Sequence, residues 1–388
     1  MSVTSAGGFR AAGVAAGLKS SGAPDLAIVV NDGPSKAAAA VFTSNRCKAN
    51  PVLWSEQAIK DGAASAVVIN SGGANCYTGA EGFQLTHATA ELAAELLDLP
   101  PIDVQVCSTG LIGLLNDADD LLAGVRTASG ELSADGGDAA SRAIMTTDSV
   151  PKTAVSSTQG AGQDGWTVGG MAKGAGMLAP ALATMLVVIT TDADLPGEVL
   201  DACLREATRT TFDRLDSDGC QSTNDTVLLM ASGASGVEPD QEAFTGALTS
   251  VCRDLALQLL ADAEGADHEI AIEVLHAASE EDAVAVGRSV ARSNLFKAAV
   301  FGKDPNWGRV LASVGTTDAV FDPADLDVAL NGVWVCRNSG LGEPADSVLL
   351  EDRAVSVTID LKSGDAAATV WTNDLTHAYV HENSAYST

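Results

Sequence analysis

The feature that most constrains the fold is an alternation of short β-branched runs with longer amphipathic helical patterns. Three apolar runs near the start are short, are bounded by Gly, Asn or Ser, and therefore predict strands at 26–30, 40–42 and 66–69. Apolar residues then recur every three or four positions from Leu85 to Leu99, which predicts a helix that ends before Pro100. Strands that alternate with such helices predict an α/β protein whose helices pack on sheets.

The second half of the chain continues this alternation. Apolar spacing from Phe244 to Leu259 predicts another helix, for which Gly265 is a suitable C-terminal stop. A strand follows, then a helical stretch, then Asn331-Gly332 between two β-branched runs, a pair typical of a hairpin. We expect a smaller C-terminal α/β domain at 281–388 and a linker at 155–165; the other predicted elements are a strand at 268–274, a helix at 280–297 and strands at 355–361 and 367–372.

The charge balance limits the classes of partner. With 22 Lys+Arg against 51 Asp+Glu, the formal net charge of -29 repels phosphate backbones and anionic headgroups, so we expect no nucleic-acid or membrane partner. The start lacks the basic and apolar regions of a signal peptide, which favours a cytoplasmic protein. Seven scattered cysteines without a CxxC pair favour reduced thiols, and five histidines without ligand spacing predict no metal.

The segment that points to chemistry runs from Gly169 to Asp192. Its first half is rich in glycine and is expected to be an irregular approach, whereas its second half is apolar and predicts a buried strand. Thr184 stands at the junction, where its hydroxyl could attack the carbonyl of Ala183. After an N-to-O acyl shift and hydrolysis, the freed α-amine, with an ordinary pKa of about 8, could serve as general base for the same hydroxyl.

Other readings of this segment have to be weighed against self-cleavage. A threonine after an alanine most often just opens a buried strand. Gly169-Gly170 with Lys173-Gly174 suggests a phosphate-binding loop, but the G-x-x-x-x-G-K-[ST] spacing is absent. A G-x-S-x-G motif is absent as well, which disfavours a serine hydrolase.

Six motifs, which follow one another along the chain, favour self-cleavage over the other readings. They are Cys107-Ser-Thr-Gly-Leu-Ile-Gly113, Met145-Thr-Thr-Asp148, Met171-Ala-Lys-Gly-Ala-Gly-Met177 leading to Ala183-Thr-Met-Leu186, Ser222-Thr-Asn-Asp-Thr226, Asp304-Pro-Asn-Trp-Gly-Arg309 and Glu382-Asn-Ser-Ala-Tyr386. Over nearly its whole length the chain resembles the glutamate N-acetyltransferase family of arginine biosynthesis, also called ornithine acetyltransferase.

The resemblance implies a fold, a reaction and an assembly. The fold is an α/β layered αββα sandwich of the self-cleaving aminopeptidase/ornithine acetyltransferase type. Cleavage would give an α chain, 1–183, and a β chain, 184–388, in which 184–280 completes the sandwich and 281–388 carries a substrate-binding tail. The reaction moves an acetyl group from N2-acetyl-L-ornithine to L-glutamate without a cofactor, and acetyl-CoA is a possible second donor. The two chains are expected to stay associated as a heterotetramer or larger assembly.

The resemblance also assigns roles to residues. Thr184 becomes the nucleophile, Ala183-Thr184 the cleavage site, and Thr109 with Gly110 the oxyanion hole. Five further residues would contact substrate together with Thr184: Thr146, Lys173, Glu264, Asn383 and Thr388. Simple alternatives remain for three sites, namely a plain β-turn at Thr109-Gly110, a surface lysine at Lys173 and a solvated helix end at Glu264.

Two rival functions remain from the sequence. One is a related N-terminal-nucleophile aminopeptidase or amidohydrolase, which would share the nucleophile but release its product to water. The other is an uncleaved amino-acid-binding protein with a vestigial site.

Overall fold

Two sheets stacked face to face form the centre of the molecule. The computed structural model describes residues 2–158, 165–177 and 185–385. The first sheet has the order β1-β2-β4-β5 and the second the order β3-β9-β8-β7-β6. The strands of the first are β1 (Phe9–Val14), β2 (Leu26–Asn31), β4 (Ala66–Asn70) and β5 (Val104–Ser108). Those of the second are β3 (Ala38–Phe42), β9 (Thr226–Ala231), β8 (Leu186–Thr191), β7 (Trp166–Lys173) and β6 (Lys152–Thr158).

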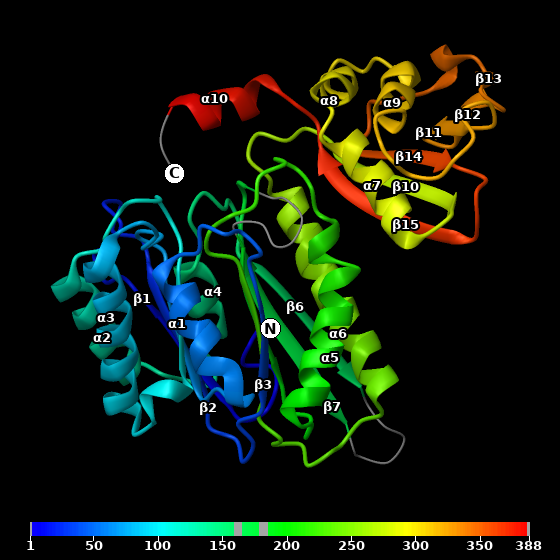
Figure 1. Ribbon diagram of the computed structural model, residues 1–388. Helices are drawn as coiled ribbons and strands as arrows, with labels where there is room; N and C mark the ends of the chain where they lie inside the picture. The colour runs from blue at the N-terminus through cyan, green and yellow to red at the C-terminus, as the bar shows by residue number, and fades with distance from the viewer. Residues whose placement is uncertain (1, 159–164, 178–184, 386–388) are drawn as a thin grey trace.

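Helices cover the outer face of each sheet (Figure 1). On the first sheet lie α1 (Asn50–Ala58), α2 (Gly79–Leu97) and α3 (Ala118–Gly130), and on the second lie α5 (Gly197–Arg209) and α6 (Gln241–Ala261). The short helix α4 (Gly137–Ala143) packs against β1, β2 and β7 and adds alanines to the core between the sheets. The predicted αββα layering is therefore confirmed.

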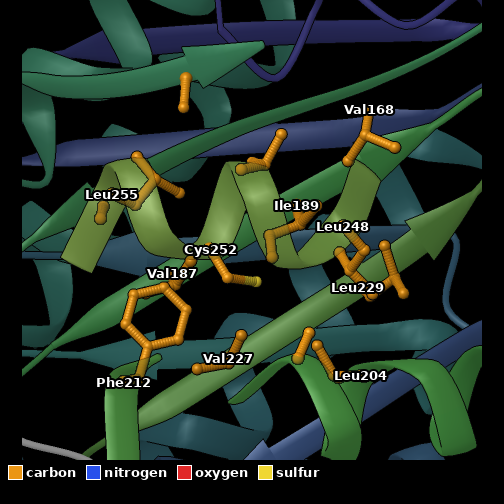
Figure 2. Close-up of a cluster of buried hydrophobic side chains, with 14 of the residues drawn as sticks. Val168, Val187, Ile189, Leu204, Phe212, Val227, Leu229, Leu248, Cys252 and Leu255 are labelled. Atoms are coloured by element: carbon orange, nitrogen blue, oxygen red, sulfur yellow. The ribbon is translucent and has the colours of Figure 1, made fainter. Parts of the chain in front are cut away.

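The strand β8 is fully buried because it has a packed layer on each side. Figure 2 shows Val187 and Ile189 of this strand facing Leu248 and Leu255 of α6. The alternate side chains, such as Val188, point into the core between the two sheets. A strand buried on both faces reads as a continuous apolar run, which explains why the sequence Leu186–Thr191 shows no polar alternation.

A third sheet forms the C-terminal unit, with the order β13-β12-β11-β14-β10-β15. The Asn331-Gly332 turn joins β11 to β12 with φ angles of +46° and +79°, the left-handed conformation that this pair favours. The strands are β10 (Glu269–Ala277), β11 (Asp327–Leu330), β12 (Val333–Arg337), β13 (Gly340–Leu341), β14 (Ala354–Asp360) and β15 (Ala366–Asn373). Since β10 precedes residue 281, the sheet starts before the expected domain boundary, which remains a prediction.

Helices α7 (Glu280–Ala291), α8 (Asn294–Phe301) and α9 (Trp307–Val314) belong to this unit. The last helix, α10 (His377–Ala385), extends from it over the end of the sandwich (Figure 1). The single-turn 3-10 helices are η1 (Ile59–Asp61), η2 (Pro101–Asp103), η3 (Phe212–Arg214) and η4 (Ala345–Ser347). No described helix is long and apolar enough to cross a membrane.

Three local expectations were wrong. Residues 155–158 of the expected linker continue β6, because they pair with Trp166 to Gly169 of β7; residues 159–164 lie outside the described part. The glycine-rich stretch 169–173 is the end of β7 and not an irregular approach, because both of its neighbours in the sheet hydrogen-bond to it. The expected single helix at 280–297 is two helices, because Ser293 caps the start of α8 with its side chain.

Candidate functional site

One cavity of about 440 Å³ lies where β5 and β7 end and α10 crosses above them. Its lining includes six of the residues singled out in the sequence: Thr109, Gly110, Thr146, Lys173, Glu264 and Asn383. They come from the turn after β5, the loop before β6, the end of β7, the turn after α6 and helix α10. The structure therefore brings together residues that are up to 274 positions apart in the chain, counted from Thr109 to Asn383.

The turn after β5 is held rigidly. Gly110 has a φ of +127°, and a Cβ atom there would lie 2.5 Å from the carbonyl oxygen of Gly72, so only glycine fits. The backbone N–H of Thr109 donates to Asn70 O at 2.9 Å. Asn224 supports the same turn, because its Nδ2 donates to Ser108 O at 2.8 Å and to Ala74 O at 2.6 Å.

Lys173 is buried and is no surface lysine. Its exposed fraction is 1%, and its Nζ donates to Thr109 Oγ1 at 3.2 Å. Burial lowers the pKa of Lys173, and the negative charge of Asp148 opposes that shift. The Lys173 amino group thus lies directly beside the Thr109 hydroxyl in the lining of the cavity.

Asp148 connects two walls of the cavity. Its Oδ2 accepts from Thr146 N at 2.9 Å, and its Oδ1 accepts from Gly174 N at 2.7 Å. The same carboxylate pairs with Lys152 at 2.6 Å, and Lys152 also pairs with Asp262. Burial alone would raise the pKa of Asp148, but the charges of Lys173 and Lys152 outweigh it and bring the pKa to about 2.

Glu264 faces the cavity from the turn after α6, beyond the helical end that the sequence suggested. Its backbone N–H donates to Ala175 O at 3.0 Å, and its carboxylate lies over Gly176, where a Cβ atom would come within 2.9 Å of it. Burial raises the pKa of Glu264, while hydrogen bonds with Thr147 and Asn383 oppose the shift. Asn383 reaches this carboxylate from α10.

A second buried carboxyl lies beside the start of β8. Asp225 is fully buried, and its Oδ1 accepts from the backbone N–H of Met185 at 3.0 Å. Burial raises the pKa of Asp225 well above its usual range, although the bond from Met185 and the charge of Lys173 oppose this.

The remaining predicted residues, Ala183, Thr184 and Thr388, lie outside the described residues. Met185, the next residue after Thr184, is buried and immediately precedes β8, and Thr226 N donates to its carbonyl oxygen at 3.2 Å. Among the residues that the structure describes, no group of three or more His, Cys, Asp or Glu side chains could hold a metal ion.

Sequence reasoning missed the roles of Asp148, Asn224 and Asp225. All three stand in motifs that carried the family resemblance, so a signal existed, but nothing in one sequence says what they contact. Lys19, which also lines the cavity, stands in no motif.

Known proteins match the chain over its whole length. The model of the ArgJ family matches residues 10–388. The arginine biosynthesis bifunctional protein ArgJ of Streptomyces coelicolor is 63% identical over 387 residues, and the protein of the same name from Thermobifida fusca is 61% identical over 388 residues. Both matches cover 100% of this chain and 100% of the relative.

Two solved structures are also similar in sequence. An ornithine acetyltransferase from Mycobacterium tuberculosis, crystallised with ornithine, is 54% identical and covers 48% of this chain and 96% of its own, with a TM-score of 0.44. An arginine biosynthesis bifunctional protein from Bacillus halodurans is 34% identical and covers 51% of this chain and 97% of its own, with a TM-score of 0.49. The sequence matches confirm the resemblance, and the chain therefore belongs to the ArgJ family, among the acetyltransferases of arginine biosynthesis.

Proposed function

We propose that the cavity beside Thr109 is where this acetyltransferase moves an acetyl group from N2-acetyl-L-ornithine to L-glutamate, through an ester on Thr184. The observation that carries the proposal is the convergence on one cavity of six residues that the family resemblance singles out and that five separate segments supply. Met185, which lies between Thr184 and the first residue of β8, donates its backbone N–H to Asp225, whose pKa responds to the charge of Lys173 in the same cavity.

The chemistry begins with self-cleavage. The Thr184 hydroxyl attacks the carbonyl of Ala183, the peptide becomes an ester, and water releases 1–183 as the α chain. The new α-amine of Thr184 then takes the proton of its own hydroxyl, which attacks the acetyl carbonyl of acetylornithine. Ornithine leaves with a proton on its α-amine. The α-amine of glutamate then attacks the resulting ester in the same cavity, the bond to the Thr184 oxygen breaks, and the proton that the amine loses returns to that oxygen as N-acetylglutamate leaves.

The oxyanion of each tetrahedral intermediate needs two donors. Lys173 Nζ donates to Thr109 Oγ1, so the hydroxyl hydrogen of Thr109 is free to point elsewhere. An adjacent ammonium group also strengthens that hydroxyl as a donor, because it withdraws electron density from the oxygen. Together with the Gly110 N–H, this hydroxyl would stabilise charge that develops only in the transition state.

The cavity lining carries a cation, Lys173, and an anion, Glu264, which together suit an amino acid with a charged side chain. Lys173, beside the reacting centre, would bind the α-carboxylate that both substrates carry next to the reacting nitrogen. Glu264, held by Asn383 and Thr147, would bind the δ-ammonium group of ornithine. Thr146 would contribute a hydroxyl between them, and Thr388 would add a contact from the chain end.

Acetyl-CoA as a second donor is part of the proposal, because the relatives are named bifunctional. An acetyl thioester could acylate Thr184 by the same attack. We further propose that the α and β chains stay associated after cleavage, since β7 of one and β8 of the other pair along six residues of a buried sheet.

The test is an acetyl-transfer assay with purified protein and labelled acetylornithine, run with and without glutamate. We expect N-acetylglutamate to form only when glutamate is present, and a parallel assay with acetyl-CoA as sole donor to give the same product. Release of free acetate at the same rate with or without glutamate would instead indicate a hydrolase.

A further inference from the structure

The proposed reaction requires one cavity to bind two substrates whose side chains carry opposite charges. Acetylornithine and glutamate both carry an α-carboxylate, but their side chains end in opposite charges, a δ-ammonium group and a γ-carboxylate. Glu264 suits the first and repels the second, so an acceptor site for glutamate needs a further cation. Among the described residues that line the cavity, the cationic side chains are Lys173 and Lys19.

Lys173 lies at the reacting end, where it contacts Thr109. Lys19 lies elsewhere in the lining, on the loop between β1 and β2, and its Nζ donates to Met145 O at 2.6 Å and to Pro24 O at 2.9 Å. Both acceptors are neutral carbonyl groups, which leaves the third N–H of the ammonium group available.

Lys19 has no carboxylate within 4.0 Å of its Nζ among the described residues. Burial lowers the pKa of Lys19, and the charges of Asp25 and Asp148 oppose that shift only from beyond ion-pair distance. An anionic ligand in direct contact with the Lys19 ammonium group would therefore stabilise its charged form.

The loop that carries Lys19 is built to hold it in place. The buried carboxylate of Asp25 accepts from the backbone N–H groups of Ala16 at 2.6 Å, of Leu18 at 2.7 Å and of Lys19 itself at 2.9 Å. Because three backbone donors converge on one carboxylate, the position of the Lys19 backbone is set before any substrate arrives.

We propose that Lys19 is a specificity-determining residue that binds the γ-carboxylate of the acceptor and so lets the ornithine site accept glutamate. This inference rests on the proposed function. It predicts that Lys19 matters for the half-reaction with glutamate and not for the half-reaction with acetylornithine.

The experiment measures the two half-reactions separately in the full cleaved enzyme. Exchange of labelled ornithine into acetylornithine reports the first half-reaction and needs no glutamate. The glutamate dependence of acetyl transfer reports the second. The variants are Lys19→Met, which removes the charge, and Lys19→Arg, which keeps it. Lys36→Met is the matched control, because Lys36 is also a half-buried lysine bonded to a backbone carbonyl group, outside the cavity lining.

For Lys19→Met we expect the glutamate concentration at half-maximal transfer to rise about 10- to 100-fold, the loss expected for one charge-assisted hydrogen bond. Ornithine exchange should stay within about twofold, Lys19→Arg should recover most of the glutamate affinity, and Lys36→Met should change neither. Equal losses in both half-reactions, or no loss with glutamate, would overturn the inference. A wild-type enzyme that exchanges no ornithine would refute the proposed function itself.

Discussion

Replacing Asp148 by Asn removes one negative charge from between two buried lysines and disturbs two walls of the cavity together. The pKa of Asp148 is lowered from 3.8 to about 2, which corresponds to about 2.5 kcal/mol of stabilisation of the folded state at neutral pH. The amide of Asn can accept only through Oδ1, so its NH2 group would face the N–H of Thr146 or Gly174 and leave a donor unpaired. Such a loss adds roughly 1–3 kcal/mol.

We therefore expect Asp148→Asn to destabilise the protein by roughly 3–5 kcal/mol at neutral pH. Asp192→Asn is the matched control, because Asp192 also accepts from two backbone N–H groups, of Thr167 at 2.7 Å and Gly7 at 2.9 Å. Asp192 has no ion pair within the described residues, so its variant should lose only about 1–2 kcal/mol.

The assay is urea denaturation followed by circular dichroism, with both variants compared with the wild type. Because the folded-state pKa of Asp148 is depressed, its stabilisation is present above pH 3.8 and is lost as the pH falls toward 2. The deficit of Asp148→Asn should thus be constant between about pH 5 and pH 7. A deficit no larger than that of Asp192→Asn would refute the assigned charge pairing.

Substitutions at Gly110, Asp225 and Glu264 test separate parts of the site. Gly110→Ala should lower the free energy of unfolding by roughly 2–4 kcal/mol and turnover by about 100-fold, because its Cβ would meet Gly72 O at 2.5 Å. The control Gly113→Ala, at a φ of +83° in open space, should lower the free energy of unfolding by only about 1–2 kcal/mol. Urea denaturation and turnover measurements check both variants, and equal effects would contradict the steric argument. Asp225→Asn should still cleave itself while Asp225→Ala should not, because the amide oxygen of Asn can accept from Met185 N as Asp225 does and Ala cannot. Gel analysis of fresh protein checks this, and equal impairment of the two variants would contradict a role for that hydrogen bond in cleavage. The affinity for acetylornithine should fall as the pH drops through the raised pKa of Glu264, because the carboxylate must be ionised to bind an ammonium group. Calorimetry on Glu264→Gln should show weaker binding that does not depend on pH. A variant with the pH profile of the wild type would exclude Glu264 as the partner of the ammonium group.

The layered fold could be predicted from the sequence because its elements carry strong local signals. The apolar spacing of α6, the β-branched runs of β2 and β4 and the Asn331-Gly332 turn each follow from local chemistry. The misassigned segments lack such signals. Glycine-rich β7 is a strand only because β6 and β8 pair with it, and that pairing is set by the tertiary structure.

The residues of the site could be predicted in part, whereas the contacts between them could not. Thr109, Gly110 and Lys173 could be singled out because they stand in motifs, but no sequence pattern says that the Lys173 ammonium group lies 3.2 Å from Thr109 Oγ1. The contacts of Asp148 and Asp225 are with backbone N–H groups, which every residue type except proline has. Lys19 reaches the cavity through a loop shaped by Asp25, and neither residue has a distinctive neighbour in the sequence.

The most direct test of the central claim is to find where the acetyl group resides between the two half-reactions. Cleaved enzyme is incubated with acetylornithine alone, quenched in acid, and analysed by intact mass and peptide mapping. We expect one acetyl group on the β chain, at Thr184, and its loss within one turnover after glutamate is added. An unmodified β chain during active turnover, or an acetyl group that glutamate does not remove, would contradict the account.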